Sequence, residues 1–281
     1  MSERLITDTM EFSGSQERAL YAIGSHALDL AARRYGTGYP EFIPGTNKNL
    51  GLNTFKHGFT VGEYSALMAD AQDLSPSLQE FSRTIGNAHD VVNEQERGKD
   101  ERESAEWLEE RLAEAGFNQK ARRLGGKAIL GTQPVFLGGD TKGVIIGQMA
   151  AHMDFESITE EKVVKGVACA DFGELYAPSS PRLGHSLLKQ RQGLDPWDEL
   201  NMEVFAAFQA KEGDFLTDFR YLLPEAEKLL TTHRREVIEY AYFLDRAARQ
   251  GDISEWSQVE ALDLAFEKDP TVRPQELLKV A

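Results

Sequence analysis

The chain has 281 residues, of which 41% are hydrophobic, and it carries a formal net charge of −15 at pH 7. This acidic balance argues against a nucleic-acid duplex as a partner, because contact with a phosphate backbone usually needs a clustered basic face. A single cysteine excludes an intrachain disulfide. Neither a bilayer-spanning apolar run nor a secretory signal is visible, so we expect a cytoplasmic protein without membrane contact.

Apolar residues recur at helical spacing through most of the sequence. Up to residue 175, this spacing predicts helices over 15–34, 61–71, 78–92, 101–115 and 159–175. Gly116 is expected to end the fourth of these helices, because glycine readily adopts the left-handed conformation that follows a helix C-terminus. The glycines and prolines of 36–45 and the polar run 93–100 indicate loops.

The segment 120–150 has mixed signals, because two glycine pairs and Pro134 interrupt its short apolar runs. The spacing predicts neither a helix nor a strand before Val144. The run from Val144 to Met153 is predicted to be helical, although its first three residues also suit a strand by propensity.

Beyond residue 175 the chain is expected to break at Pro178, Pro181 and Gly184. Two long helical patterns follow over 200–249, divided near Pro224, and a short helix is expected over about 255–267. Since almost every pattern has the 3.6-residue period of a helix, the sequence predicts a single all-α domain over residues 1–281. The long C-terminal helices could pack against a second copy of the chain, which would form a homodimer.

Two histidines and two aspartates stand in otherwise apolar surroundings: His57, the adjacent His89 and Asp90, and Asp171. A set of imidazoles and carboxylates suits one divalent ion among Mn, Mg, Co, Ni, Zn and Fe. Four protein ligands leave positions open on a five- or six-coordinate metal. One open position could hold a water whose pKa the metal lowers toward ~7, and the other a phosphoryl oxygen. The set therefore indicates hydrolysis of a phosphate ester.

Plainer interpretations exist for each of these residues. His89 and Asp90 could be a polar pair on the surface, and His57 could cap a helix or lie in a loop. Asp171 could belong to a buried salt bridge. Their apolar flanks favour metal binding, because an unpaired carboxylate is costly to bury.

Three segments resemble, in this order, the motifs of the HD superfamily of metal-dependent phosphohydrolases. They are His57-Gly58-Phe59-Thr60-Val61, Asn87-Ala88-His89-Asp90-Val91-Val92 and Val167-Ala168-Cys169-Ala170-Asp171-Phe172. Two further stretches, Asp100–Ala105 and Ile129–Thr132, resemble one subgroup of predicted HD phosphohydrolases. The resemblance covers about 50–220. It implies an HD-domain helical bundle there, with additional N-terminal helices and a helical C-terminal extension over about 221–281.

By this resemblance one divalent metal ion would have four ligands, namely His57, His89, Asp90 and Asp171. The implied activity is hydrolysis of a nucleotide or another small phosphate ester by attack of metal-bound water. A single metal is expected because His152 is the only histidine between Asp90 and Asp171, whereas members of the superfamily that bind two metals need two more.

Related nucleotidases place a catalytic glutamate after the His-Asp pair, where this chain has Asn93 with Glu94 next to it. Glu94 and Asp90 are therefore the catalytic candidates, with Glu94 or a neighbour handling protons. The candidate substrate-binding residues are Lys56, Arg97, Glu101, Thr132 and His152. Asn93 also supports a second hypothesis, in which the chain is a helical regulatory module that binds a metal or ligand without turnover.

Overall fold

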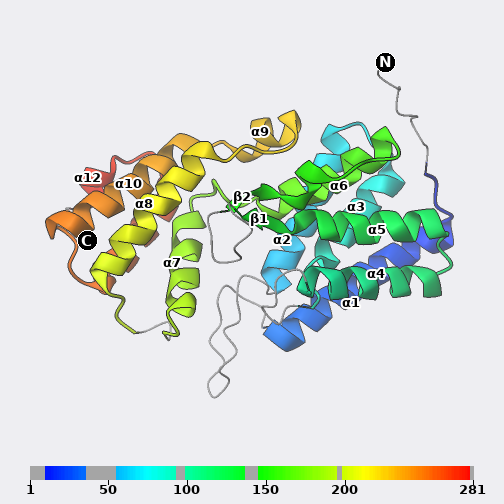
Figure 1. Ribbon diagram of the computed structural model, residues 1–281, viewed down its shortest axis with the longest axis horizontal. Helices are drawn as coiled ribbons and strands as arrows, with labels where there is room; N and C mark the ends of the chain where they lie inside the picture. The colour runs from blue at the N-terminus through cyan, green and yellow to red at the C-terminus, as the bar shows by residue number, and fades with distance from the viewer. Residues whose placement is uncertain (1–9, 36–54, 93–98, 137–144, 195–197, 279–281) are drawn as a thin grey trace. The chain divides into compact units, whose positions relative to one another are not determined.

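The computed structural model describes residues 10–35, 55–92, 99–136, 145–194 and 198–278 of the 281-residue chain (Figure 1). Helices form most of this described part, and its one sheet consists of two short strands. The all-α fold predicted from the sequence is therefore confirmed. None of the described helices combines the length and the apolar character that a membrane span requires.

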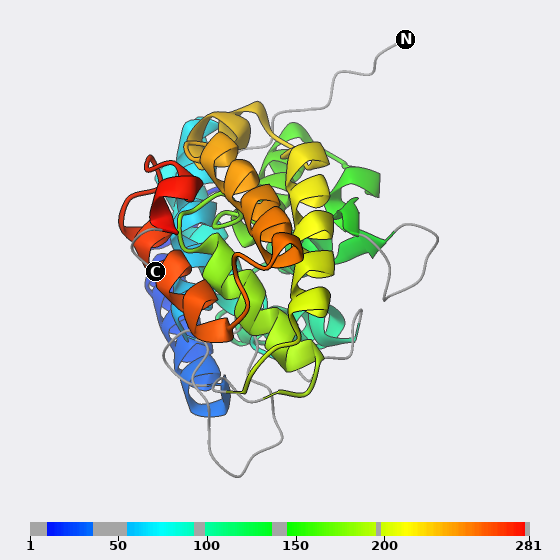
Figure 2. The same ribbon diagram turned by 90° about the vertical axis from the view of Figure 1, so that its left-hand side faces the viewer.

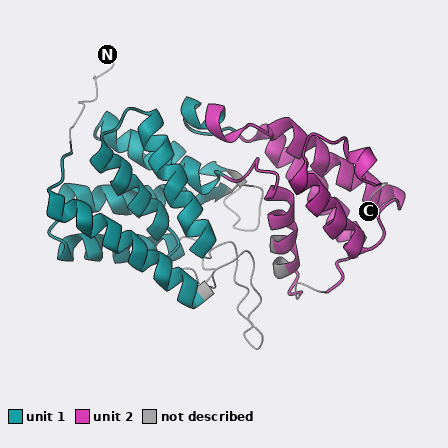
Figure 3. Ribbon diagram, turned by 180° about the vertical axis from the view of Figure 1, so that it is seen from behind, with its two compact units in different colours: residues 1–39, 53–173, 220–227 teal, residues 40–52, 174–219, 228–281 magenta. Residues whose placement is uncertain are grey.

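The chain forms two compact units (Figure 3). Unit 1 comprises residues 1–39, 53–173 and 220–227, and unit 2 comprises residues 40–52, 174–219 and 228–281. The sequence led us to expect one domain with a core reaching to about residue 220. The boundary between the two compact units lies after Gly173, and the short segment 220–227 returns to unit 1. All four predicted metal ligands belong to unit 1.

The helices of unit 1 are α1 (Gly14–Tyr35), α2 (Phe55–Ala71), α3 (Pro76–Ala88), α4 (Asp100–Glu114), α5 (Gln119–Thr132) and α6 (Ile158–Asp171). Apolar spacing predicted all of them except α5. The expected role of Gly116 is confirmed, because it follows α4 with a φ of 76°. Ser75 and Ser157 accept hydrogen bonds at the starts of α3 and α6, which fixes where these two helices begin.

The helix α5 was not predicted, because its glycine pair interrupts the apolar spacing. An added Cβ at Gly125 would lie 3.2 Å from methyl groups of both Leu108 and Leu112 on α4, and one at Gly126 would meet the side chain of Glu109. The glycine pair therefore marks a close approach of α5 to α4. This tertiary contact overrides the weak helix propensity of glycine.

The helix predicted from Val144 to Met153 is wrong. The described part of this run forms β2 (Ile145–Gln148) and a short 3-10 helix, η2 (Met149–His152). The strand pairs antiparallel with β1 (Pro134–Phe136), so that Pro134 lies opposite Gln148. The β propensity of the branched residues at the start of this run prevailed, because a partner strand is available.

A single apolar core holds the helices of unit 1 together. The helix α2 packs against α3 and α6, α5 packs against α4 and α6, and α1 lies on α3. Fully buried side chains from several of these helices meet in the core, among them Phe81, Ile85, Leu108, Ile129 and Val167. Each such side chain contributes about 1.5–3 kcal/mol on burial. The core therefore fixes α2 and α6, which carry His57 and Asp171, and α3, which His89 and Asp90 directly follow.

The helices of unit 2 are α7 (Ser180–Arg191), α8 (Met202–Asp218), α10 (Arg234–Gln250), α11 (Trp256–Lys268) and α12 (Pro274–Leu277). In Figure 2, α8 and α10 run side by side, as their contacts also show. The helix α9 (Pro224–Leu230) begins in unit 1 and ends in unit 2. The helical pattern predicted after Pro224 is thus two helices, with a break over 231–233.

The expected break at Pro181 and Gly184 is also wrong, because both residues lie within α7. Pro181 is in the first turn, where a helix needs no hydrogen bond from the backbone nitrogen. An added Cβ at Gly184 would lie 2.6 Å from a carboxylate oxygen of Glu212 on α8. As in α5, the glycine permits a close contact with a neighbouring helix.

Unit 2 contains a buried polar network centred on His185. Its Nδ1 lies 2.6 Å from Asp263 Oδ2, and its Nε2 lies 2.7 Å from the side-chain nitrogen of Gln209. The hydroxyl of Tyr240 donates to the other oxygen of Asp263 at 2.9 Å. Burial raises the pKa of the nearby Glu212 to about 7, although the charge of His185 opposes the shift.

We expect unit 2 to lose stability as the pH rises from 5 to 8. The pKa of Glu212 is about 7 in the folded chain against an ordinary value of 4.5, so folding favours the protonated form. The free-energy cost of ionising the buried Glu212 carboxyl is absent at a pH below its ordinary pKa. It is complete at a pH above its pKa in the folded chain. Asp263 also raises the pKa of His185 against the effect of burial, which adds stability that is lost as the pH rises.

Glu212→Gln should therefore stabilise unit 2 at pH 8 by about 3 kcal/mol, and much less at pH 5. Urea denaturation at both pH values measures the effect, and hydrogen exchange of α7 and α11 peptides assigns it to unit 2. Glu239→Gln is the control, because that carboxylate is exposed on α10 in a 3.8 Å ion pair with Arg235. An equal change in both variants would contradict a role for burial of Glu212.

Candidate metal centre

The first candidate ligand, His57, lies in the first turn of α2 and is buried. The helix begins at Phe55, earlier than the predicted start at residue 61. His57 is therefore held by a regular helix and is not a loop residue. Gly58 beside it lies close to α1 and α3, because an added Cβ there would be 3.2 Å from Leu28 and 3.4 Å from the Asn87 carbonyl oxygen.

Two glycines allow α2 and α3 to cross in close contact. An added Cβ at Gly86 on α3 would lie 2.8 Å from both Gly62 Cα and the Val61 carbonyl oxygen, and 2.6 Å from Ser65 Oγ. An added Cβ at Gly62 would meet the side chain of Asn87. Neither Gly62 nor Gly86 was predicted to have a role at the site. The spacing of Gly58 and Gly62, one turn apart on a helix, is the signal that could have found this contact.

The second and third candidates, His89 and Asp90, follow directly after the last residue of α3. The fourth, Asp171, is the last residue of α6. Because α2 packs against both α3 and α6, the start of α2 and the ends of α3 and α6 come together. The three segments that carry the candidates are thus placed by the core of unit 1.

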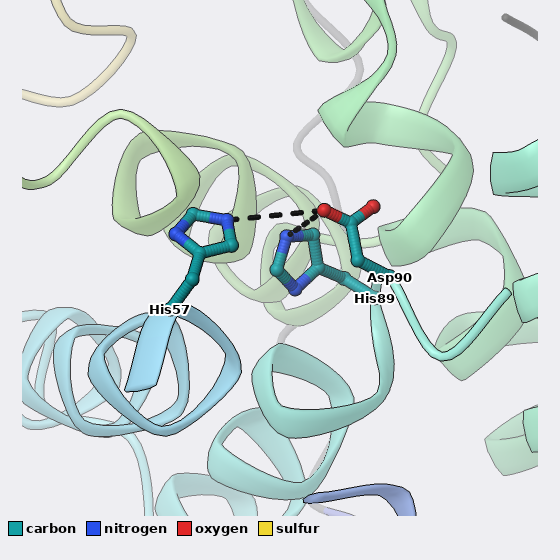
Figure 4. Close-up of side chains that lie close together, drawn as sticks. All are labelled: His57, His89 and Asp90. Carbon is teal, nitrogen blue, oxygen red and sulfur yellow. Dashed lines mark ion pairs between the residues drawn. The ribbon is translucent and has the colours of Figure 1, made fainter. Parts of the chain in front are cut away.

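The side chains of His57, His89 and Asp90 form one cluster (Figure 4), and the Asp171 carboxylate lies beside its two histidines. Asp90 Oδ2 lies 3.8 Å from His57 Nε2 and 3.2 Å from His89 Nε2. Asp171 Oδ1 lies 3.5 Å and 3.2 Å from the same two nitrogens. Ligand atoms of His57, His89 and Asp90 all lie within 4.8 Å of one another, a separation that one cation could bridge. The plainer interpretation of His89 and Asp90 as a surface pair is excluded for His89, which is 1% exposed.

The hydrogen bonding of His89 orients its ring. Its Nδ1 lies 2.7 Å from the Gly86 carbonyl oxygen, which can only accept, so Nδ1 carries the proton and donates it. This leaves Nε2, which is buried and makes no hydrogen bond of good geometry with another described residue. In the neutral ring its lone pair faces two carboxylates, which is unfavourable unless a cation or a proton lies between them. The residues present therefore fit a divalent metal ion.

Without a metal, protons adjust the charge of this cluster. Burial alone would lower the pKa of His89, but Asp90 and Asp171 raise it well above its usual range. Burial alone would raise the pKa of Asp171, but the His57 and His89 rings hold it well below its usual range. The cluster thus favours the ionised form of Asp171 and attracts positive charge.

The other predicted site residues have less definite places. Thr132 is buried, and its hydroxyl donates a hydrogen bond to the Ile129 carbonyl at 2.7 Å. This hydrogen bond lies within α5. His152 is exposed at the end of η2, Lys56 is exposed beside His57, and Glu101 is partly exposed in the first turn of α4. Glu94 and Arg97 lie outside the described residues.

Comparisons with protein-family models, with curated proteins and with solved structures return no match. The chemistry of this centre is therefore inferred from its own residues and from the motifs that carry them.

Proposed function

We propose that the chain is an HD-type metal-dependent phosphohydrolase that acts on a nucleotide or another small phosphate ester. The observation that carries the proposal is the convergence of two imidazoles and two carboxylates from three separate helix ends. His89 Nε2 lies 3.2 Å from an oxygen of each carboxylate. Such a set of nitrogen and oxygen donors is typical of mononuclear divalent metal sites.

The residues of the site would have different roles. His57, His89, Asp90 and Asp171 would hold the metal, and the Gly86 carbonyl keeps Nε2 of His89 available by holding the proton on Nδ1. When bound, a divalent metal would polarise a phosphoryl oxygen and supply a nucleophile from water at neutral pH. The carboxylates of Asp90 and Asp171 would repel a negatively charged phosphate. Binding of the phosphate would therefore require the positive charge of the metal.

The experiment starts with purified full-length chain. We expect metal analysis to find one divalent ion per chain, and phosphate to be released from a panel of nucleotides and simple phosphate esters. Removal of the metal with a chelator should abolish the release, and added Mn²⁺ should restore it. Bound metal without turnover across the panel would instead support the regulatory module, and a chain that binds no metal would refute the site itself.

A further inference from the structure

The segment 220–227 returns to unit 1 and contacts the end of α6, where Asp171 lies. Tyr221 is buried, and its hydroxyl donates to the Phe172 carbonyl at 2.7 Å. Its backbone N–H donates to Glu227 Oε1 at 2.8 Å. Tyr221 is thus fixed at both its backbone and its hydroxyl, and it contacts the residue that directly follows the candidate ligand.

The same segment contacts α6 on the other side of Asp171. The backbone N–H groups of Leu222 and Leu223 lie within hydrogen-bond reach of the thiol of Cys169, which is fully buried. Leu222 also packs against the apolar core of unit 1. The last turn of α6 is therefore held by the returning segment at residues 169 and 172.

Asp171 needs this support because of its position in the helix. The last carbonyl groups of a helix have no partner inside it, and helix ends fray when nothing else binds them. Tyr221 supplies a donor to such a carbonyl at Phe172. On the following residue, an added Cβ at Gly173 would meet the Tyr64 ring of α2, so the backbone there also lies against the helix that carries His57.

We propose that Tyr221 is a positioning residue of the metal centre, which holds the end of α6 so that the Asp171 carboxylate stays beside His89 and His57. This inference rests on the proposed function, because it assigns Tyr221 to the metal site defined there. The Tyr221 hydroxyl is committed to the Phe172 carbonyl, so it is not itself proposed as a metal ligand. Tyr221 acts through the Phe172 carbonyl, and it lies in the chain beyond the whole of α7 and α8.

The simpler interpretation is that Tyr221 only stabilises unit 1, and a matched variant separates the two. In unit 2, the buried hydroxyl of Tyr176 donates to the Leu216 carbonyl, also at 2.7 Å. Tyr221→Phe and Tyr176→Phe therefore remove the same kind of hydrogen bond from the two units. A loss of stability is expected for both variants, but a loss of metal affinity only for Tyr221→Phe.

The test is a titration of metal-free full-length chain with Mn²⁺, in which the free ion is measured by electron paramagnetic resonance. We expect Tyr221→Phe to bind Mn²⁺ about tenfold more weakly than the wild type, at the lower end of the effect of outer-sphere partners of metal ligands. Tyr176→Phe should bind as the wild type does. Phosphate release by Tyr221→Phe should recover at saturating Mn²⁺, because the ligands themselves are intact.

The outcomes distinguish the inference from the proposed function. If the wild type binds Mn²⁺, His89→Ala does not, and Tyr221→Phe binds normally, Tyr221 has no positioning role and the proposed site stands. Equal weakening in both tyrosine variants would also overturn the inference, since it would reflect general loss of stability. If the wild type does not bind Mn²⁺ through His89, the proposed function fails and the inference fails with it.

Discussion

Asp171→Asn is expected to abolish metal binding and, with it, the proposed phosphohydrolase activity. The substitution keeps the shape of the side chain but removes the negative charge 3.5 Å from His57 Nε2 and 3.2 Å from His89 Nε2. Loss of outer-sphere partners costs about tenfold to a hundredfold in metal affinity, so loss of an anionic ligand should cost more than about a hundredfold. Metal analysis and a titration with Mn²⁺ measure the affinity, and phosphate release measures the activity.

Asp154→Asn is the matched control, because this exposed aspartate lies in unit 1 between η2 and α6. Its side chain should be dispensable for both metal binding and turnover. If Asp171→Asn kept its full metal content, Asp171 would belong to a salt bridge with the histidines, and the site would be limited to the cluster of His57, His89 and Asp90. If activity were lost while metal remained, Asp171 would act in the reaction and not as a ligand.

Gly86→Ala is expected to destabilise unit 1 and to weaken the metal site, although it places a better helix former in α3. Two of the nearest atoms to the added methyl group are backbone atoms, Gly62 Cα and the Val61 carbonyl oxygen, at 2.8 Å. Backbone atoms cannot rotate away, so α2 and α3 must separate. Overpacking of this kind costs about 1–3 kcal/mol or more, against a propensity gain of about 1 kcal/mol.

The separation of α2 from α3 should also displace the candidate metal ligands from one another. His57 is on α2, whereas His89 and Asp90 directly follow α3, and metal–ligand distances tolerate shifts of only about 0.2 Å. We therefore expect lower Mn²⁺ affinity as well as a lower urea midpoint. Gly147→Ala is the control, since an added Cβ there meets nothing within 4 Å. A Gly86→Ala variant as stable as wild type, with unchanged affinity, would show that the helix crossing is not tightly packed.

Local patterns in the sequence were enough to predict the helical class and most helix positions in unit 1. Apolar periodicity depends on which face of one helix is buried, so it can be read without knowing the partner. The same patterns singled out His57, His89, Asp90 and Asp171, because charged groups in apolar runs stand out. Their convergence remained a prediction until three helix ends were seen to meet.

The predictions from local sequence patterns failed at glycine residues. The pair in α5 and Gly184 in α7 suggested interruptions, yet each permits close contact with a neighbouring helix. Whether a glycine ends a helix or lets two helices touch depends on what lies opposite its missing side chain, and that is a property of the folded chain.

The sequence by itself thus determined the kind of elements and the chemical character of the candidate ligands, since both follow from residue types and short-range spacing. Only the tertiary structure decided that the chain divides after Gly173, that α2 and α3 cross at Gly62 and Gly86, and that Tyr221 returns to the end of α6. These features join residues distant in the chain. Their free energy comes from packing and hydrogen bonds between elements, to which no local pattern corresponds.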